Sequence, residues 1–241
     1  MEQKRDTILA ELRSQILRLE GFRTASSDTT QRGIDPIRNA FPGGIFPLGC
    51  VHEFLWSETE NFSATGAFIA SLIPAWIRPH GVIVWISTDR KVMPSALPVF
   101  GVAPDHILFI QVRDKDALWV TEEALKSKAV TAVVAELREL SFTNSRRLQL
   151  AVEQSQTTGF VIRQLRGNMG TTACVSRWKI THRASQAVDS LPGIGYPSWQ
   201  VDLLRVRNGK PASWQVYWSD DHFEYVERNS VDTLLPQAEV G

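Results

Sequence analysis

The sequence predicts an α/β fold in which a mostly parallel sheet is preceded by an N-terminal amphipathic helix and followed by a C-terminal β-hairpin. Three observations support this prediction. Short apolar runs alternate with helical patterns from Ile34 onward, only strand-like segments follow Thr172, and Asn208-Gly209 is a dipeptide typical of tight turns between strands. With 241 residues and 43% apolar content, the chain is expected to form one domain with appendages.

The first segment, residues 1–32, is predicted to be a helix and a linker. Charges separate a series of apolar side chains at helical spacing between residues 4 and 20: Ile8, Leu9, Leu12, Ile16 and Leu19. The helix is expected to end at Gly21, and the polar residues 24–31 carry too little apolar surface to fold. Two interpretations remain open, because the helix could dock on its own core or bind a partner through Leu9, Leu12, Ile16 and Leu19.

The core is predicted to span residues 33–228. Its sheet is expected from strands at residues 51–56, 81–86, 106–112, 130–135 and 159–162, with helices at 62–77, 93–100, 114–126 and 143–156. Pro74 should bend the first of these helices. Strands at 173–180, 199–206 and 212–218 follow, and the last two should form the hairpin. Residues 229–241 are predicted to be a frayed acidic tail.

Composition argues against several classes of protein. Lys and Arg together number 26, as do Asp and Glu, so no overall field draws the chain to nucleic acid or an acidic membrane. Cys50 and Cys174 form no CxxC pair, which suits buried reduced thiols. The five histidines lack metal-ligand spacing, and no GxSxG or Cys-His arrangement indicates nucleophilic catalysis. The apolar stretches are too short to span a bilayer and no signal peptide is evident, so we expect a cytoplasmic protein without a metal site.

Several segments resemble the RecA family of ATPases. FPGGIFPLG (residues 41–49) followed by VHEFL (51–55) is similar to the segment that leads into the first core strand of those proteins. VWISTD (84–89) resembles the strand that ends in their catalytic carboxylate, TAVVAE (131–136) resembles the Walker B strand, and FVIRQ (160–164) resembles the strand whose Gln senses the γ-phosphate. The resemblance covers about residues 34–226 and implies a RecA-like three-layer core.

Three longer segments are similar to ImuA proteins within that superfamily: DALWVTEEAL (116–125), SRRLQLAVEQS (145–155) and PSWQVDLLRVRNGKPASWQVYW (197–218). This resemblance implies a non-catalytic accessory protein of error-prone translesion DNA repair in the SOS response. In the family, such a protein bridges the inactive Y-family polymerase homologue ImuB, an error-prone C-family polymerase and RecA. Homo-oligomerisation is left open.

The phosphate-binding loop of an ATPase is expected to be degenerate. A working loop reads GxxxxGK[ST], so that backbone N–H groups and the Lys can bind phosphates. The corresponding window, WSETENFS (56–63), has Trp56 and Asn61 at the glycine positions and Phe62 at the lysine position, while Glu58 adds negative charge and only Ser63 is retained. The sequence therefore predicts no ATP hydrolysis and no cofactor.

Acidic strand ends usually mark catalysis in this architecture. Asp89, Glu136 and Gln164 have no phosphates to act on if the loop is lost. One interpretation is that they cap helices or bind water at the edge of the sheet. The other is that they form a relic site for another anion or a metal.

Two groups of basic residues could bind macromolecules. The stretch 154–188 contains Arg163, Arg166, Arg177, Lys179 and Arg183 but no acid, so we consider a DNA contact through the first four, against a solvated strand face. Arg205 and Arg207 continue the alternation of Trp199 beside the hairpin turn, and resemble two lysines of the RecA hairpin that reach a neighbouring protomer. Two interpretations remain open, because these arginines could contact a protomer or RecA, or be ordinary exposed arginines of a strand.

Two other functions remain open. A SulA-like cell-division inhibitor would share a RecA core without ATP, although the long N-terminal helix and linker argue modestly against it. A RecA-like DNA-dependent ATPase is the second alternative, and binding of Mg-ATP would distinguish it.

Overall fold

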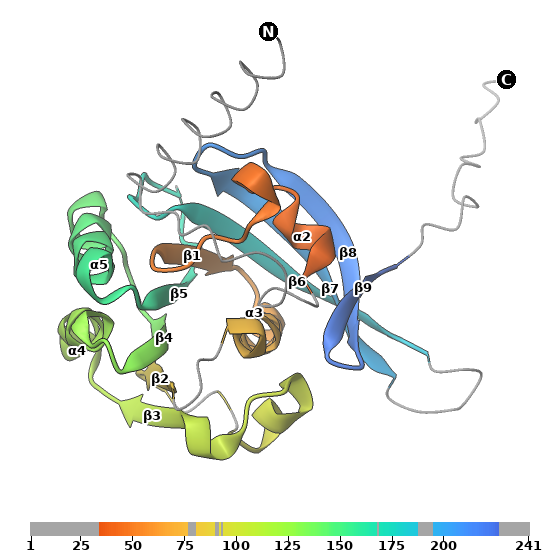
Figure 1. The fold of residues 1–241 in the computed structure, drawn as a ribbon, viewed down its shortest axis with the longest axis horizontal. Helices are drawn as coiled ribbons and strands as arrows, with labels where there is room; N and C mark the ends of the chain where they lie inside the picture. Colours follow the sequence, from red (N-terminus) through yellow and green to blue (C-terminus); the bar gives the residue numbers. More distant parts are fainter. Residues whose placement is uncertain are drawn as a thin grey trace, which may run out of the picture.

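The computed structural model describes residues 34–76, 81–89, 92, 94–167, 169–187 and 195–226. Within these residues a single nine-stranded sheet has the order β3-β2-β4-β5-β1-β6-β7-β8-β9, and helices cover both of its faces (Figure 1). Neighbouring strands are parallel from β3 to β6 and antiparallel from β6 to β9. The three-layer core with a mostly parallel sheet and a C-terminal hairpin is confirmed. The predicted N-terminal helix, its linker and the acidic tail lie outside the described residues.

The strands of the sheet are β1 (Val51–Trp56), β2 (Val82–Ser87), β3 (Ile107–Gln111), β4 (Val130–Glu136), β5 (Thr158–Gln164), β6 (Ser176–Gln186), β7 (Tyr196–Val206), β8 (Ala212–Ser219) and β9 (His222–Tyr225). The α-helices are α2 (Asp35–Arg38), α3 (Thr59–Leu72), α4 (Asp114–Lys126) and α5 (Phe142–Ser155). Four 3₁₀ helices complete the described elements: η1 (Pro42–Gly44), η2 (Ile73–Trp76), η3 (Pro94–Phe100) and η4 (Pro104–His106).

The predicted bounds are met by β1 and α4, whereas other elements differ. The helix predicted at 62–77 begins at Thr59 and changes to the 3₁₀ helix η2 around Pro74, which lacks the N–H that an α-helix needs. The segment 93–100 is a 3₁₀ helix with Pro98 inside it, for the same reason. The strand predicted at 173–180 starts later and extends to Gln186. The short elements α2 and β9 were not predicted.

Two apolar clusters hold the layers together. On one face α3 packs against the sheet around Phe54, Phe68 and Trp178, and on the other face α4 and α5 pack around Val133 and Leu148. All five of these side chains are buried, and β1 is buried on both sides, as expected for a central parallel strand. Both cysteines are buried and free, as predicted.

A β-bulge changes the direction of the side chains at the end of β7. Trp178 pairs with Leu203 and Arg177 pairs with Arg205, so Leu204 is an extra residue in the ladder. The side chain of Arg205 consequently lies on the same face of the sheet as Arg177, and not on the face that carries Trp199. The prediction that Arg205 and Arg207 continue the alternation of Trp199 is therefore wrong, because a bulge shifts the period of two by one residue. The hairpin itself is confirmed, with Asn208 at a positive φ of 58° in the turn.

Candidate functional site

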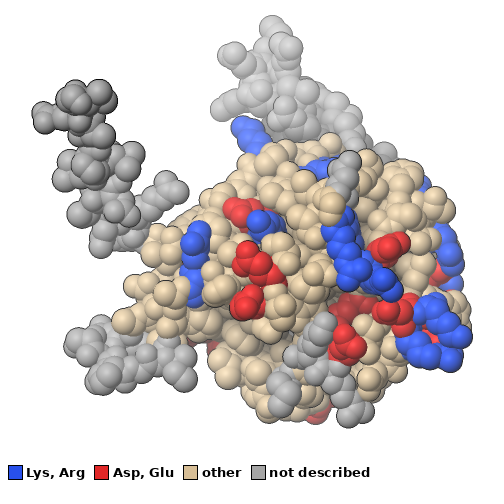
Figure 2. Space-filling model, turned by 180° about the vertical axis from the view of Figure 1, so that it is seen from behind, with Lys and Arg blue, Asp and Glu red and all other residues tan. Residues whose placement is uncertain are grey.

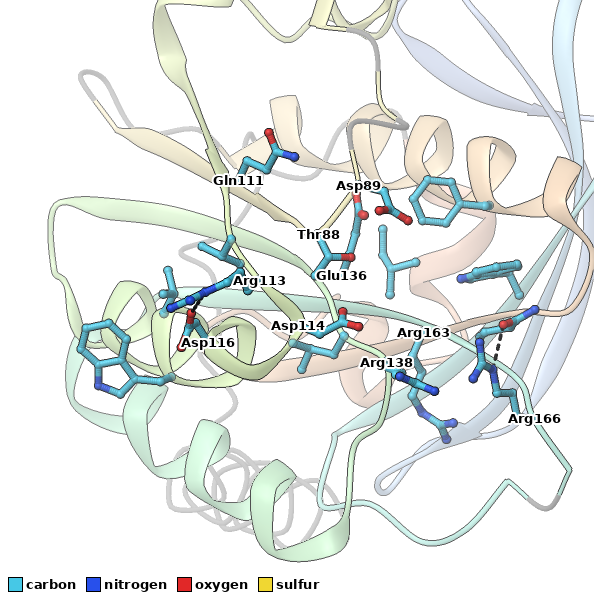
Figure 3. A pocket seen from close by; sticks show the side chains of 18 residues that line it. Thr88, Asp89, Gln111, Arg113, Asp114, Asp116, Glu136, Arg138, Arg163 and Arg166 are labelled. Carbon is cyan, nitrogen blue, oxygen red and sulfur yellow. Dashed lines mark hydrogen bonds and ion pairs between the residues drawn. The ribbon is translucent and has the colours of Figure 1, made fainter.

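A cavity of about 1300 Å³ lies at the carboxyl ends of strands β1 to β5 (Figure 3). This edge is where α/β sheets usually bind ligands, because loops from successive strands converge there. The residues that line the cavity are Trp56, Phe62, Thr88, Asp89, Gln111, Val112, Arg113, Asp114, Asp116, Trp119, Val120, Glu136, Leu137, Arg138, Ile162, Arg163, Gln164 and Arg166. Acidic and basic side chains are mixed along its walls.

Five of the eight residues predicted for a degenerate nucleotide site come together in this cavity, namely Trp56, Phe62, Asp89, Glu136 and Gln164. The other three do not line it. Glu58 and Ser63 are exposed at the start of α3. Asn61 is 2% exposed and its Oδ1 contacts His182 of β6, accepting the backbone N–H at 3.0 Å and lying 3.0 Å from the ring Nδ1.

The chain passes almost directly from β1 into α3. Only Ser57 and Glu58 separate the last residue of the strand, Trp56, from the first residue of the helix, Thr59. The comparison with a phosphate-binding loop placed Asn61, Phe62 and Ser63 at its end, but the structure places them within α3, where the N–H of Asn61 already donates to the carbonyl of Glu58 at 2.9 Å. Phe62 is 4% exposed, and its ring meets that of Trp56 edge-on with centroids 5.5 Å apart.

The three polar residues at the strand ends are held differently. Glu136 is 7% exposed, and its Oε1 accepts a hydrogen bond from Nε1 of Trp85 at 3.1 Å. Gln164 accepts a hydrogen bond from Nε of Arg166 at 2.9 Å. Asp89 is exposed, and its backbone carbonyl accepts from the hydroxyl of Ser87 at 2.6 Å. The sheet edge therefore places all three around one cavity, and each is engaged by a neighbour.

Beside the cavity, Glu53 is a fully buried carboxylate that the sequence analysis did not single out. Its Oε1 accepts from Nε of Arg163, and its Oε2 accepts from Nε of Arg177, both at 2.6 Å. The hydroxyl of Thr172 also donates to Oε2, at 2.9 Å. A buried carboxylate needs such partners, since an unpaired charge is expensive in the interior.

This cluster corrects the predicted DNA contact. Arg163 and Arg177 are 8% and 7% exposed and neutralise Glu53, so they do not form a solvent-facing cationic surface. The charge pattern of residues 154–188 does not reveal the acid that pairs with both arginines, because Glu53 lies on β1, far away in the sequence. The one available signal was an acid in the middle of the apolar strand VHEFLW.

Four arginines also hold the segment of residues 169–173, which we name the clamped loop. Its backbone carbonyls accept hydrogen bonds as follows: Met169 from Arg163 at 2.9 Å, Gly170 from Arg177 at 3.1 Å, Thr172 from Arg205 at 2.9 Å and Ala173 from Arg207 at 3.1 Å. The guanidinium groups come from β5, from β6 and from the end of β7. The clamped loop is thus fixed to three segments, with Met169 41% exposed on it.

Of the four residues predicted to contact DNA, Arg166 is exposed at the cavity and Lys179 is half-buried on β6, opposite Asp202 of β7. Figure 2 shows one face of the molecule, on which basic groups are interspersed with acidic and neutral surface. No long basic track crosses that view. Arg166 and Lys179 remain the available cations of the predicted group.

A second buried polar side chain belongs to β1 itself. His52 is fully buried, and burial lowers its pKa to about 4. Its Nε2–H donates to the carbonyl of Pro47 at 2.9 Å, while Nδ1 accepts from the hydroxyl of Ser176 at 2.6 Å. Burial also raises the pKa of the Cys174 thiol to about 12, and that of Cys50 still further above its usual range. The neutral imidazole has both nitrogens satisfied, which suits a structural group.

No group of three or more His, Cys, Asp or Glu side chains in the described part of the chain is placed to hold a metal ion. None of the described helices is both long enough and apolar enough to cross a membrane.

Comparison with known proteins identifies relatives of this chain. No family model matches the sequence. Two proteins called Protein ImuA, from two strains of Caulobacter vibrioides, are each 33% identical over 195 residues, covering 76% of this chain and 80% of their own length. The crystal structure of SulA from Pseudomonas aeruginosa matches 48% of this chain and 98% of that protein with 20% identity and a TM-score of 0.41. On the identity and coverage of the first two, the chain belongs to the ImuA family.

Proposed function

We propose that this ImuA-family protein is a non-catalytic accessory factor of error-prone translesion DNA repair in the SOS response. The observation that carries the non-catalytic part is the two-residue connection between Trp56 and Thr59, which leaves no loop to surround phosphates. The proposed role in this repair pathway rests on membership of the ImuA family.

The energetics of the site support the absence of turnover. A phosphate-binding Lys contributes charge-assisted hydrogen bonds of about 1.5–3 kcal/mol, and Phe62 at that position makes none. The positive end of the α3 dipole could attract an anion. Glu58 and Glu60, at the N-cap and in the first turn, already place negative charge at that end. A triphosphate would therefore meet repulsion where an ATPase supplies attraction.

An adaptor acts through surfaces, and we assign three to this protein. Leu9, Leu12, Ile16 and Leu19 of the N-terminal segment bind a protein partner. Arg205 and Arg207 lie beside the clamped loop, so a protomer or RecA surface that contacts them also contacts this loop. Arg166 and Lys179 make a weak contact with DNA. The partners proposed are an ImuB-type inactive polymerase homologue, an error-prone C-family polymerase and RecA.

A pull-down from damage-induced cells tests the adaptor function. The full chain and a variant lacking residues 1–22 are compared, and their thermal unfolding is measured alongside. We expect the full chain to recover the polymerase-related proteins and the shortened chain to lose at least one of them without a change in unfolding temperature. Recovery of a tubulin-like division protein instead would support a cell-division inhibitor.

Titration calorimetry with Mg-ATP tests the absence of a nucleotide site. We expect no saturable heat up to millimolar nucleotide, because the lost lysine and the missing loop both weaken binding of the same phosphate groups. Micromolar binding would overturn the non-catalytic proposal and favour a DNA-dependent ATPase. Adding single-stranded DNA at low salt to the same protein measures the weak DNA contact, and a flat anisotropy titration would remove it.

A further inference from the structure

The cavity at the carboxyl ends of the strands separates its charges along the order of the strands. Asp114 and Asp116 lie at the start of α4, which follows β3 at the end of the sheet, so they place acidic groups at one end of the cavity. Arg138 follows β4 and Arg166 follows β5, so they place basic groups at the other end. Figure 3 shows Asp116 at one side, Asp114 nearer the middle, and Arg138 and Arg166 at the opposite side. The cavity is therefore bipolar.

Two of these charges are available to a ligand. Arg113, the cation at the acidic end, donates its Nε–H to Asp116 at 2.8 Å, which offsets both charges. Asp114 and Arg138 are exposed, and neither side chain takes part in an ion pair or a hydrogen bond with another residue that the structure describes. One acid and one base thus line the cavity with their charges uncompensated by the described part of the chain.

A second arginine follows the strand beside that of Arg138. Strands β4 and β5 are parallel neighbours, with Glu136 opposite Ile162, so the residues that follow them leave the sheet side by side. Within the described residues Arg166 donates only its Nε–H, to Oε1 of Gln164 at 2.9 Å, and its terminal nitrogens remain for a ligand. Two guanidinium groups at one end of a cavity suit a carboxylate, which accepts charge-assisted hydrogen bonds on both oxygens.

The uncharged lining suits a protein ligand. Trp119 lines the cavity and is 63% exposed, and indole rings are frequent anchors of protein interfaces. Apolar side chains from several segments also line the cavity: Trp56, Phe62, Val112, Val120, Leu137 and Ile162. At about 1300 Å³ the cavity exceeds the volume of roughly 300–1,000 Å³ that is usual for small-molecule sites, so it has room for several residues of a peptide.

We propose that this cavity binds a segment of a partner protein that carries one acidic and one basic side chain. Arg138 and Arg166 bind the acid, and Asp114 binds the base. A nucleic-acid strand or a polyphosphate is disfavoured, because it has no cation for Asp114 and brings negative charge to the acidic end. Since Arg166 is shared with the proposed DNA contact, the segment and DNA compete for this one residue.

Selection from a library of short random peptides displayed on phage tests this proposal, with the full chain as the target. We expect the enriched sequences to share one acidic and one basic residue at a fixed spacing. The most enriched sequence is then synthesised with a fluorescent label, and its dissociation constant is measured by anisotropy. Oligothymidylate is titrated separately as the probe for nucleic acid.

Charge exchange assigns the two ends of the cavity. Arg138→Glu and Asp114→Lys should each weaken binding of the peptide at least about tenfold, because each places like charges opposite one another. Replacing the acid of the peptide with Lys should restore binding to Arg138→Glu. Trp119→Ala, which changes no charge, should also weaken binding. All three positions are exposed, and thermal unfolding verifies that the variants fold.

Arg146→Glu on α5 is the matched control. Arg146 is exposed, does not line the cavity and makes no ion pair or hydrogen bond through its side chain within the described residues. This variant alters the net charge as Arg138→Glu does, so it should leave the dissociation constant of the peptide unchanged.

Three results would overturn this proposal: no enrichment of sequences that carry both charges, a selected peptide that Arg138→Glu and Asp114→Lys bind as tightly as the unchanged chain, or oligothymidylate binding that Arg138→Glu abolishes while no peptide is selected. The last result would assign the cavity to nucleic acid. The choice of a protein ligand follows from the charges and lining of the cavity and not from the proposed role in DNA repair, so the two proposals can fail separately.

Discussion

Arg177 of β6 lies directly opposite Glu53 of β1 in the parallel register, and its Nε–H donates to Oε2 of that carboxylate at 2.6 Å. Arg163 reaches the same carboxylate from β5 on the other side of β1. One acid thus connects three strands, and the same guanidinium groups hold the clamped loop beside the cavity. The edge of the candidate site is fixed by an ion cluster inside the sheet.

Replacing this acid should destabilise the fold strongly. Glu53→Ala leaves two buried guanidinium groups without their counter-ion, which typically costs about 3–5 kcal/mol. Urea denaturation measures the loss. Glu123→Ala is the matched control, because its pair with Lys126 is exposed and should change the free energy of unfolding by less than about 1 kcal/mol. Equal losses in the two variants would contradict the structural importance of the cluster.

The buried His52 should make stability depend on pH. Its folded pKa of about 4 lies below the ordinary value of 6.5, so the unfolded chain binds the proton more tightly. Stability is fully present above pH 6.5 and is lost as the pH falls toward 4, by about 3 kcal/mol in total. Urea denaturation across this range measures the slope. His52→Gln removes the titrating group and should flatten it, whereas equal slopes would assign the effect to other groups.

Asn61 should stabilise the contact between α3 and β6. Its Oδ1 accepts the backbone N–H of His182, so Asn61→Ala leaves that partly buried donor unsatisfied and should cost about 1–3 kcal/mol. Ser63→Ala, at an exposed position of the same helix, should have little effect. Thermal or urea unfolding compares the two. If Asn61→Ala left the stability to unfolding unchanged, this helix would be positioned by its apolar face alone.

Restoring the missing lysine should not restore a nucleotide site. Phe62→Lys supplies a cation, but the connection between Trp56 and Thr59 still has two residues and offers no phosphate cradle. Calorimetry with Mg-ATP should show no saturable binding. The variant should also unfold more easily, by about 3 kcal/mol, because an almost fully buried ring is lost. Saturable binding by this single variant would show that the missing charge, rather than the missing loop, abolishes the site.

Much of the fold could be predicted from patterns local in the sequence. Continuous apolar runs such as the one ending at Ala135 predicted buried parallel strands, and Asn208-Gly209 predicted the hairpin turn. The helix from Asp114 to Lys126 was predicted with its observed bounds. Part of the candidate site followed as well, because Asp89, Glu136 and Gln164 stand at strand ends that share one edge of the sheet.

Other features could not be predicted, because they depend on distances between segments. The arginines of residues 154–188 looked like a basic surface until the strand order placed Arg163 and Arg177 on either side of Glu53. The extra residue at Leu204 places the Arg205 side chain on the opposite face of the sheet from the one expected. No local sequence pattern predicts a bulge of this kind.

By itself the sequence determined where most of the strands and the three long helices lie, and that the lysine of a phosphate-binding loop is replaced by Phe62. Only the tertiary structure decided that α3 begins two residues after β1 and that Glu53 is shared by two arginines. The physical reason is that burial periodicity is a property of neighbouring residues, whereas an ion cluster or a shortened loop results from strand order, register and packing among residues far apart in the chain.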